Sequence, residues 1–318
     1  MENKYEYLVF TPCITYNHAH YITEAMDGFV MQNTNFPVAY AIIDDASTDG
    51  EQEIIRKYIS EHFETDDPSI SRHEETGDYQ LIFAQHQTNK NCFFVVLLLK
   101  YNHYQIKKAK RPYILEWLNS SKYIAECEGD DYWIDPLKLQ KQVDFMESHP
   151  EHSLCFCANQ RLLPSGEIVF DKRYDSDMEI CPMKDIILGG GGYMATNSML
   201  YRQSMYVPTT WAPNCPVGDL PLMLTLSQKG LVGYLADVMC VYRIAAEGSW
   251  TIHMKSGIKT RRKHHKAILK MWHQFDKYSN YQYHSIVVKK KWNNIRTHFS
   301  DVIHTVLLKI KNDVLCFN

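Results

Sequence analysis

Long apolar runs are missing from this sequence of 318 residues. The longest, CFFVVLLL at Cys92–Leu99, has eight residues, whereas a helix that crosses a bilayer needs about 20. The first ten residues, MENKYEYLVF, are charged and lack the apolar stretch of a signal peptide. The nine cysteines have no paired spacing, which is typical of reduced thiols. These absences predict a cytoplasmic protein.

Acidic residues are scarce at one end of the chain. The net charge is −3, but residues 251–318 hold 14 Lys or Arg against three Asp, a balance of +11, which leaves −14 for residues 1–250. Two interpretations of this basic extension stay open. Its helices pack on the acidic body, or they contact an anionic membrane peripherally, where each Lys or Arg adds about 1 kcal/mol. Its 300–311 segment has apolar residues at helical spacing.

The first 131 residues alternate between strand and helix patterns. Apolar, β-rich stretches predict strands at 7–16, 38–45, 79–84 and 122–127, and helical periodicity predicts helices at 20–32 and 50–63. Residues 64–78 are interpreted as a polar loop, and we expect helices within 86–119. This order predicts an α/β fold, with a mixed and mostly parallel central sheet flanked by helices.

Residues 132–250 mix both patterns. We predict a helix at 135–150, capped by Asp135 and begun by Pro136, and a second helix at 218–230. A hairpin is expected at 153–170, strands at 198–202, 234–238 and 239–243, and a glycine loop at 188–193. The predicted domains are 1–250, with halves 1–131 and 132–250, and a basic helical extension at 251–318.

Two predicted strands end in acidic turns. Asp44 and Asp45 follow one buried strand, and Glu128, Asp130 and Asp131 follow another. Because ligands of open α/β sheets bind beyond the carboxyl ends of the strands, both turns can line one site. Carboxylates suit Mg²⁺ or Mn²⁺, which bind through one or two of them plus phosphate oxygens. The alternative for Asp130 and Asp131 is that they only cap the helix that follows. At the first turn Ser47, Thr48 and Asp49 can cap the next helix, but such capping does not explain Asp44 and Asp45.

Several motifs in order resemble a known family. "TPCITYNHAHYITEAMDGFVMQ", "AIIDDASTDG" and "KYIAECEGDDYW" followed by "PLKLQKQ" are similar to motifs of inverting family-2 glycosyltransferases of the GT-A fold, of the bacterial surface-polysaccharide type. The resemblance covers roughly residues 5–245. "VGDLPLMLTLSQKGLVGYLADVMCVYR" is similar to the acceptor half of these enzymes.

The resemblance implies roles for individual residues. Asp219 matches the catalytic base, and Asp130, Glu128 and Asp131 match the metal ligands. The implied contacts to the nucleotide-sugar are Thr11, Pro12, Tyr16 and Asn17 on a first loop, Asp44 and Asp45 at the base or ribose, Asn89, and Glu128, Gly129 and Asp130 in the acidic turn.

This sequence departs from the family pattern at three places. Glu128 replaces the usual first Asp of the D-x-D motif. The segment between Asp49 and Lys122 is long and lacks an N-x-G loop, for which "TNKN" at 88–91 is the nearest equivalent. The histidine often found after "YR" is absent, and His253 is a substitute only if it is not an ordinary surface or core histidine.

The expected function is metal-dependent transfer of a sugar from a nucleotide-sugar, with a UDP-sugar as the expected donor. The acceptor would be a glycan or lipid-linked molecule in cell-surface polysaccharide synthesis. One alternative is a nucleotidyltransferase, but "FTPCITYNHAH" has no glycine for a phosphate loop. The other is a non-catalytic protein that binds sugar nucleotides. Nucleic acid is not an expected partner, because no recognition motif is present.

Overall fold

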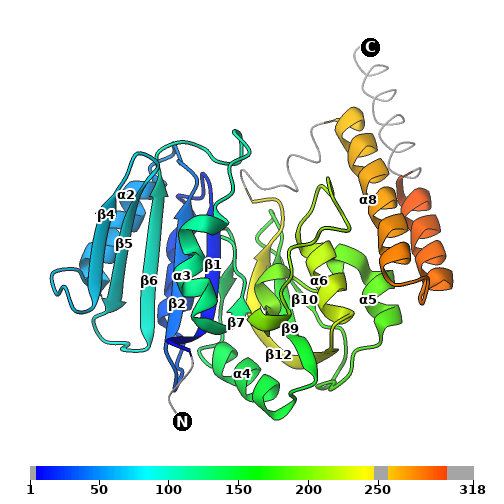
Figure 1. Ribbon diagram of the computed structural model, residues 1–318, viewed down its shortest axis with the longest axis horizontal. Helices are drawn as coiled ribbons and strands as arrows, with labels where there is room; N and C mark the ends of the chain where they lie inside the picture. Colours follow the sequence, from blue (N-terminus) through cyan, green and yellow to red (C-terminus); the bar gives the residue numbers. More distant parts are fainter. Residues whose placement is uncertain (1–4, 247–256, 299–318) are drawn as a thin grey trace. The chain divides into compact units, whose positions relative to one another are not determined.

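The computed structural model describes residues 5–246 and 257–298, and the chain forms two compact units (Figure 1). The first comprises Met1–Cys181, Met194–Tyr206 and Lys229–Ile252, and the second comprises Pro182–Tyr193, Val207–Gln228 and His253–Asn318. The units therefore interleave along the chain instead of dividing at residue 250. His253 and the 300–311 segment lie outside the described residues.

One sheet runs through the first unit. Its centre has four parallel strands in the order β6 (Cys92–Leu99), β2 (Val38–Asp44), β1 (Tyr7–Thr15) and β7 (Ser121–Ala125) (Figure 1). Outside β6, β5 (Tyr79–His86) pairs antiparallel with β6, β3 (Phe63–Glu64) and β4 (Ser71–Glu75). Beyond β7 lie β11 (Met199–Arg202), β9 (His152–Leu162), β12 (Leu231–Arg243) and β8 (Tyr132–Trp133), and β10 (Ile168–Asp171) pairs with β9. The predicted mixed α/β fold with a parallel centre is confirmed.

Helices of the first unit bury apolar stripes against this sheet. They are α1 (Ile22–Val30), α2 (Glu51–His62), α3 (Leu115–Asn119) and α4 (Lys138–Ser148), with short 3₁₀ turns at Arg111–Ile114, Thr196–Ser198 and Gln203–Met205. Phe29 of α1 stacks on Tyr40 of β2 with ring centres 4.9 Å apart, and it meets Trp133 edge-on at 5.0 Å. Fully burying an apolar side chain such as Phe contributes about 1.5–3 kcal/mol.

Several predicted elements differ from the structure. The apolar run at Cys92–Leu99 is strand β6 and not a helix, because a central parallel strand is covered on both faces and so is apolar throughout. The predicted polar loop at 64–78 contains β4. Helix α4 begins at Lys138, although Asp135 still accepts a hydrogen bond from the Leu137 N–H at 2.8 Å. The two strands predicted at 234–243 are one strand, β12.

The second unit is helical. It contains α5 (Met183–Gly189), a 3₁₀ turn at Gly190–Gly192, α6 (Asp219–Ser227), α8 (Ile258–Tyr278) and helical residues 284–298. Trp272 and Phe275 of α8 are fully buried, and Trp211 stacks on Tyr278 at 5.3 Å. Lys290 donates a hydrogen bond to the Leu188 carbonyl at the end of α5, at 2.7 Å. No helix in residues 5–246 and 257–298 is long and apolar enough to cross a membrane.

Candidate functional site

The carboxyl ends of β1, β2, β6 and β7 meet at one edge of the sheet, which we call the carboxyl edge. Thr15 at the end of β1 pairs with Asp44 at the end of β2, and Asp44 pairs with Leu98 of β6. The segments that leave these strands are therefore 16–21, 45–50, 100–110 and 126–131. Both acidic turns of the sequence lie at this edge, on either side of β1.

The first two of these segments are joined by the buried carboxylate of Glu51. It accepts hydrogen bonds from the Thr15 hydroxyl, the His18 N–H at 2.9 Å and the Ser47 hydroxyl at 2.8 Å. Asn17, in the left-handed region at φ 57°, donates its N–H to Ser47 at 2.9 Å. Burial raises the pKa of Glu51. Asn17, at the start of its loop, is thus held against the acidic turn after β2.

Thr11 and Pro12 are not on that loop. Both lie inside β1, where Thr11 is fully buried and its hydroxyl has no partner among the described residues. Proline has no N–H to donate to a neighbouring strand, and the β1–β7 pairing ends at Phe10. The chain after β7 then follows β1 through single bonds, such as Gly129 N–H to the Ile14 carbonyl at 3.1 Å.

Asp44 and Asp45 have different surroundings. Asp44 is fully buried, and one carboxylate oxygen accepts from the Ser47 N–H at 3.0 Å and the Gln52 amide at 2.5 Å. Its other oxygen has no partner within the described residues, and burial raises the pKa of Asp44. Asp45 turns to the 100–110 segment, which supplies three donors to its carboxylate (His103 N–H at 2.7 Å, Tyr104 N–H at 3.1 Å and the Lys110 ammonium at 2.8 Å).

Asn89 lies away from the carboxyl edge. It precedes β6, and its amide donates to the carbonyls of Val30 and Gln32, both at 2.9 Å. The structure therefore does not bring Asn89 together with the acidic turns, and "TNKN" is not the missing loop. The segment at the correct end of β6 is 100–110. If residues 92–99 are interpreted as a buried parallel strand, the segment that follows them, 100–110, is predicted at the carboxyl edge.

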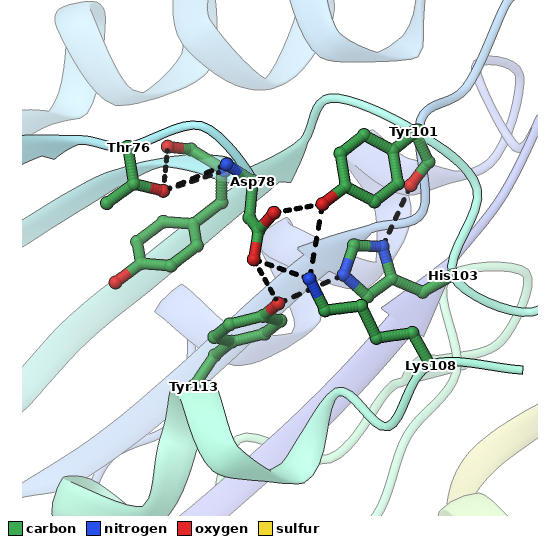
Figure 2. A network of polar contacts seen from close by, with 7 residues as sticks. Thr76, Asp78, Tyr101, His103, Lys108 and Tyr113 are labelled. Carbon is green, nitrogen blue, oxygen red and sulfur yellow. Dashed lines mark hydrogen bonds and ion pairs between the residues drawn. The ribbon is translucent and has the colours of Figure 1, made fainter. Parts of the chain in front are cut away.

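A polar network fixes the 100–110 segment on its other side (Figure 2). Asp78, in the turn between β4 and β5, accepts from the Lys108 ammonium at 2.5 Å, the Tyr113 hydroxyl at 3.0 Å and the Tyr101 hydroxyl. These hydrogen bonds hold the pKa of Asp78 well below its usual range, and the bond from Lys108 has the largest effect. The imidazole of His103 bonds the Tyr113 hydroxyl at 3.1 Å and the Tyr101 carbonyl at 2.9 Å.

The second acidic turn packs tightly on β1. A Cβ on Gly129 would lie 2.2 Å from the Thr15 hydroxyl oxygen, so only glycine fits. Glu128 is exposed. Asp130 is mostly buried, and its carboxylate forms no hydrogen bond or ion pair with any described residue. Asp131 is different, because it accepts the Arg243 N–H at 2.7 Å and is built into the turn. Burial, then the charge of Asp130, raises the pKa of Asp131.

Arg243, to which no sequence motif assigns a role in the site, holds this turn. From the end of β12 it donates to the Asp130 carbonyl at 2.5 Å and pairs with Glu24. Its guanidinium lies 4.5 Å from the ring centre of Tyr21, as in a cation–π contact. The sequence signal for this role is the "YR" pair at the end of the last predicted strand, 239–243.

A metal would have few protein ligands here. Among the described residues no group of three or more His, Cys, Asp or Glu side chains could hold a metal ion. Mg²⁺ typically takes one or two carboxylates and completes its shell with water and substrate phosphates. The Asp130 carboxylate fits that role. Asp131 is buried and one of its oxygens accepts the Arg243 N–H, so only its other oxygen is left for a cation.

Asp219 belongs to the second unit, where it is the first residue of α6. Burial raises the pKa of Asp219, while the Leu220 N–H lowers it. A Cβ on Gly191 would lie 3.9 Å from one carboxylate oxygen, so the glycine loop passes beside it without crowding it. A half-buried carboxylate with a raised pKa is suited to accept a proton.

Comparison with known proteins agrees with this fold. The family model for glycosyl transferase family 2 matches residues 13–79. Uncharacterized proteins of Mycobacterium tuberculosis and Mycobacterium bovis are 32% identical over 244 residues, 74% of this chain. The match covers only 59% of the length of these relatives.

Two solved structures share the fold. S. aureus TarS in complex with UDP-GlcNAc has a TM-score of 0.51 at 15% identity, over 84% of this chain and 66% of that one. The mannosyltransferase PcManGT from Pyrobaculum calidifontis, in complex with GDP-Man and Mn²⁺, has a TM-score of 0.50 at 12% identity, over 99% and 82%. These likenesses show that the chain has the GT-A fold. The match to the family model over residues 13–79 confirms the predicted resemblance to family-2 glycosyltransferases.

Proposed function

We propose that this chain is an inverting glycosyltransferase that transfers a sugar from a nucleotide-sugar, with UDP as the expected nucleotide, to a hydroxyl of a glycan or lipid-linked acceptor. The observation that carries the proposal is the Asp130 carboxylate at the carboxyl edge, which has no partner among the described residues and lies in a turn held by Arg243 and Gly129. The family match at residues 13–79 and the complexes of the two structural neighbours support the donor class.

The donor would lie along the carboxyl edge. Tyr16 and Asn17 on the first loop, with Asp45 beyond β2, would contact the nucleoside. Asp130 would hold Mg²⁺ or Mn²⁺, with the exposed Glu128 as a further contact. Bound there, such an ion offsets the negative charge that the diphosphate gains as the glycosidic bond breaks. Asn89 and Asp131 are not part of this proposed site.

Asp219 would remove the proton from the acceptor. The acceptor oxygen attacks the anomeric carbon, its proton passes to the Asp219 carboxylate, and the bond to the diphosphate breaks, so the nucleoside diphosphate leaves. One displacement inverts the anomeric configuration. The raised pKa of Asp219 makes it a better proton acceptor than an exposed Asp.

The test is a panel of UDP-, GDP- and dTDP-sugars, each with and without Mn²⁺. A donor that binds the native state should raise the melting temperature by mass action. Turnover with the selected donor, labelled in the sugar, should release nucleoside diphosphate. Release of pyrophosphate from a nucleoside triphosphate would instead identify a nucleotidyltransferase. Binding without turnover would leave only a sugar-nucleotide-binding protein.

We also propose that α8 contacts an anionic membrane near a lipid-linked acceptor. One face of this helix packs through Trp272 and Phe275. The other exposes cations with no acidic partner in the described residues, at Lys259, Arg262, Lys263, Lys266, Lys270 and Lys277. The double variant Lys266→Glu, Lys270→Glu should lose sedimentation with phosphatidylserine vesicles, with Lys184→Glu as a surface control. Equal binding of wild type and double variant would refute this contact.

A further inference from the structure

Within the first unit, two separate carboxylate–lysine pairs anchor the 100–110 segment to its neighbours. Lys110 pairs with Asp45 at the end of β2, at 2.8 Å, and Lys108 pairs with Asp78 in the β4–β5 turn, at 2.5 Å. The two lysines are two residues apart, and the two carboxylates come from different elements. Neither Asp78 nor Lys108 is explained by the proposed transfer reaction.

The buried Asp45 carboxylate keeps one acceptor site that no described residue occupies. A carboxylate offers about four lone-pair sites. Tyr104 N–H and Lys110 occupy one oxygen of Asp45, and His103 N–H takes one site on the other. One acceptor site therefore remains, on an oxygen whose direction is set by backbone donors of the 100–110 segment. The direction of this remaining acceptor site of Asp45 therefore depends on the position of the 100–110 segment.

The Asp78 anchor is connected to Asp45 through His103 (Figure 2). The fully buried imidazole must donate from Nδ1 to the Tyr101 carbonyl, since a carbonyl only accepts, and Nε2 bonds the Tyr113 hydroxyl. The same hydroxyl lies 3.0 Å from Asp78, so its single proton serves either Nε2 or the Asp78 carboxylate. His103 therefore links the two anchors: its ring bonds Tyr113 of the Asp78 network, and its backbone N–H donates to Asp45.

We propose that Asp78 is a positioning residue for the nucleotide-sugar. Through Lys108, Tyr113 and His103 it fixes the 100–110 segment, and the segment fixes Asp45 with its remaining acceptor site available to an N–H or hydroxyl of the nucleoside. The ligand in this inference rests on the proposed function. The coupling between Asp78 and Asp45 does not.

Hydrogen–deuterium exchange, resolved by residue, tests the coupling without any ligand. In Lys108→Met and in Asp78→Asn, the amides of His103 and Tyr104 should exchange at least tenfold faster, because the segment that carries them loses one anchor. Lys107→Met is the matched control: it makes the same charge change in the same segment, at an exposed side chain, and should leave both amides unchanged. Wild-type exchange at both amides in both variants would overturn the proposal.

Nucleotide binding and kinetics test the positioning role. The Kd for UDP and the KM for the donor should rise about tenfold in Lys108→Met, with kcat at saturating donor within twofold of wild type, and Lys108→Arg should restore most of the affinity. Faster amide exchange with an unchanged Kd would overturn the role toward the nucleotide. A wild-type protein that binds no nucleotide would refute the proposed function, while the exchange rates would still decide the coupling.

Discussion

The two acidic turns at the carboxyl edge look alike in sequence but differ in their partners. The carboxylates of the turn after β2 are bound by neighbouring residues. Asp44 accepts hydrogen bonds from Ser47 and from Gln52 of α2, and Asp45 binds three donors from the 100–110 segment. The turn after β7 binds the protein mainly through its backbone and Asp131, and it leaves the Asp130 carboxylate without a partner among the described residues. A carboxylate that neighbours already hold can orient a ligand, whereas one without partners can bind a cation.

The largest expected effect lies outside both turns. Asp219→Asn should lower kcat by about 10³–10⁴-fold, in the range of general-base catalysis. The Kd for UDP should stay within twofold, because Asp219 belongs to the acceptor chemistry in the proposed mechanism. Rapid-quench measurement of sugar transfer, with calorimetry for UDP, checks both halves. Transfer at the wild-type rate would refute the base assignment.

Asp130→Ala should have the next largest effect and separates the two turns. Loss of the proposed ligand should reduce kcat/KM by about 10²–10³-fold, the magnitude of a lost electrostatic contact to the leaving group. The Mn²⁺-dependent part of the thermal shift with UDP should disappear. Glu53→Gln serves as the control, since it alters an exposed acid of α2 outside the proposed site and should leave kcat/KM unchanged.

Gly129→Ala tests how tightly the second turn packs. Because the new methyl group would overlap the Thr15 side chain, the free energy of unfolding should fall by about 1–3 kcal/mol. Gly77→Ala is the matched control, because no atom lies within 4 Å of its added Cβ. Urea denaturation of both variants gives the comparison, and equal stability would mean that the turn can move away from β1.

Asp45→Asn in the first turn should have a smaller effect on activity than the changes above. The amide keeps one oxygen acceptor but loses the ion pair with Lys110, so the donor KM should rise about tenfold, the cost of one charge-assisted hydrogen bond of about 1.5 kcal/mol. The Mn²⁺ dependence should remain. A loss of Mn²⁺ dependence in this variant would mean that Asp45, and not Asp130, is the metal ligand.

The pH dependence of kcat gives the smallest effect near neutrality. Asp219 must be ionised to accept a proton, and burial raises its pKa, so kcat should fall as the pH drops through that raised value. The decline should begin at a higher pH than for an exposed Asp and reach tenfold per pH unit. The Kd for UDP, measured over the same range, should not follow this profile. A flat kcat profile down to pH 4 would argue against Asp219.

The sequence predicted the class of fold and the two acidic turns because strand patterns and local motifs are short-range signals. It did not predict what each acid contacts. Asp45 meets His103 and Lys110 only because β6 lies beside β2, and the sequence pattern predicts no strand within 86–119. Arg243 reaches Asp130 across 113 positions of sequence, and Asn89 was assigned by local likeness although it lies at the other end of β6. Distant pairings of this kind are set by strand order.

The interleaved chain has a consequence for dissecting the protein by deletion. Leu188 and Trp211 come from stretches before residue 250, yet their partners Lys290, Phe275 and Tyr278 come after it. A protein truncated at residue 250 would lack the helices that cover Leu188 and Trp211. The exposed apolar side chains would promote aggregation, whatever role the C-terminal region has in binding or transfer. Gene fusions and truncations would therefore report on misfolding, and single side-chain changes on the exposed face of α8 are the informative way to study the C-terminal region.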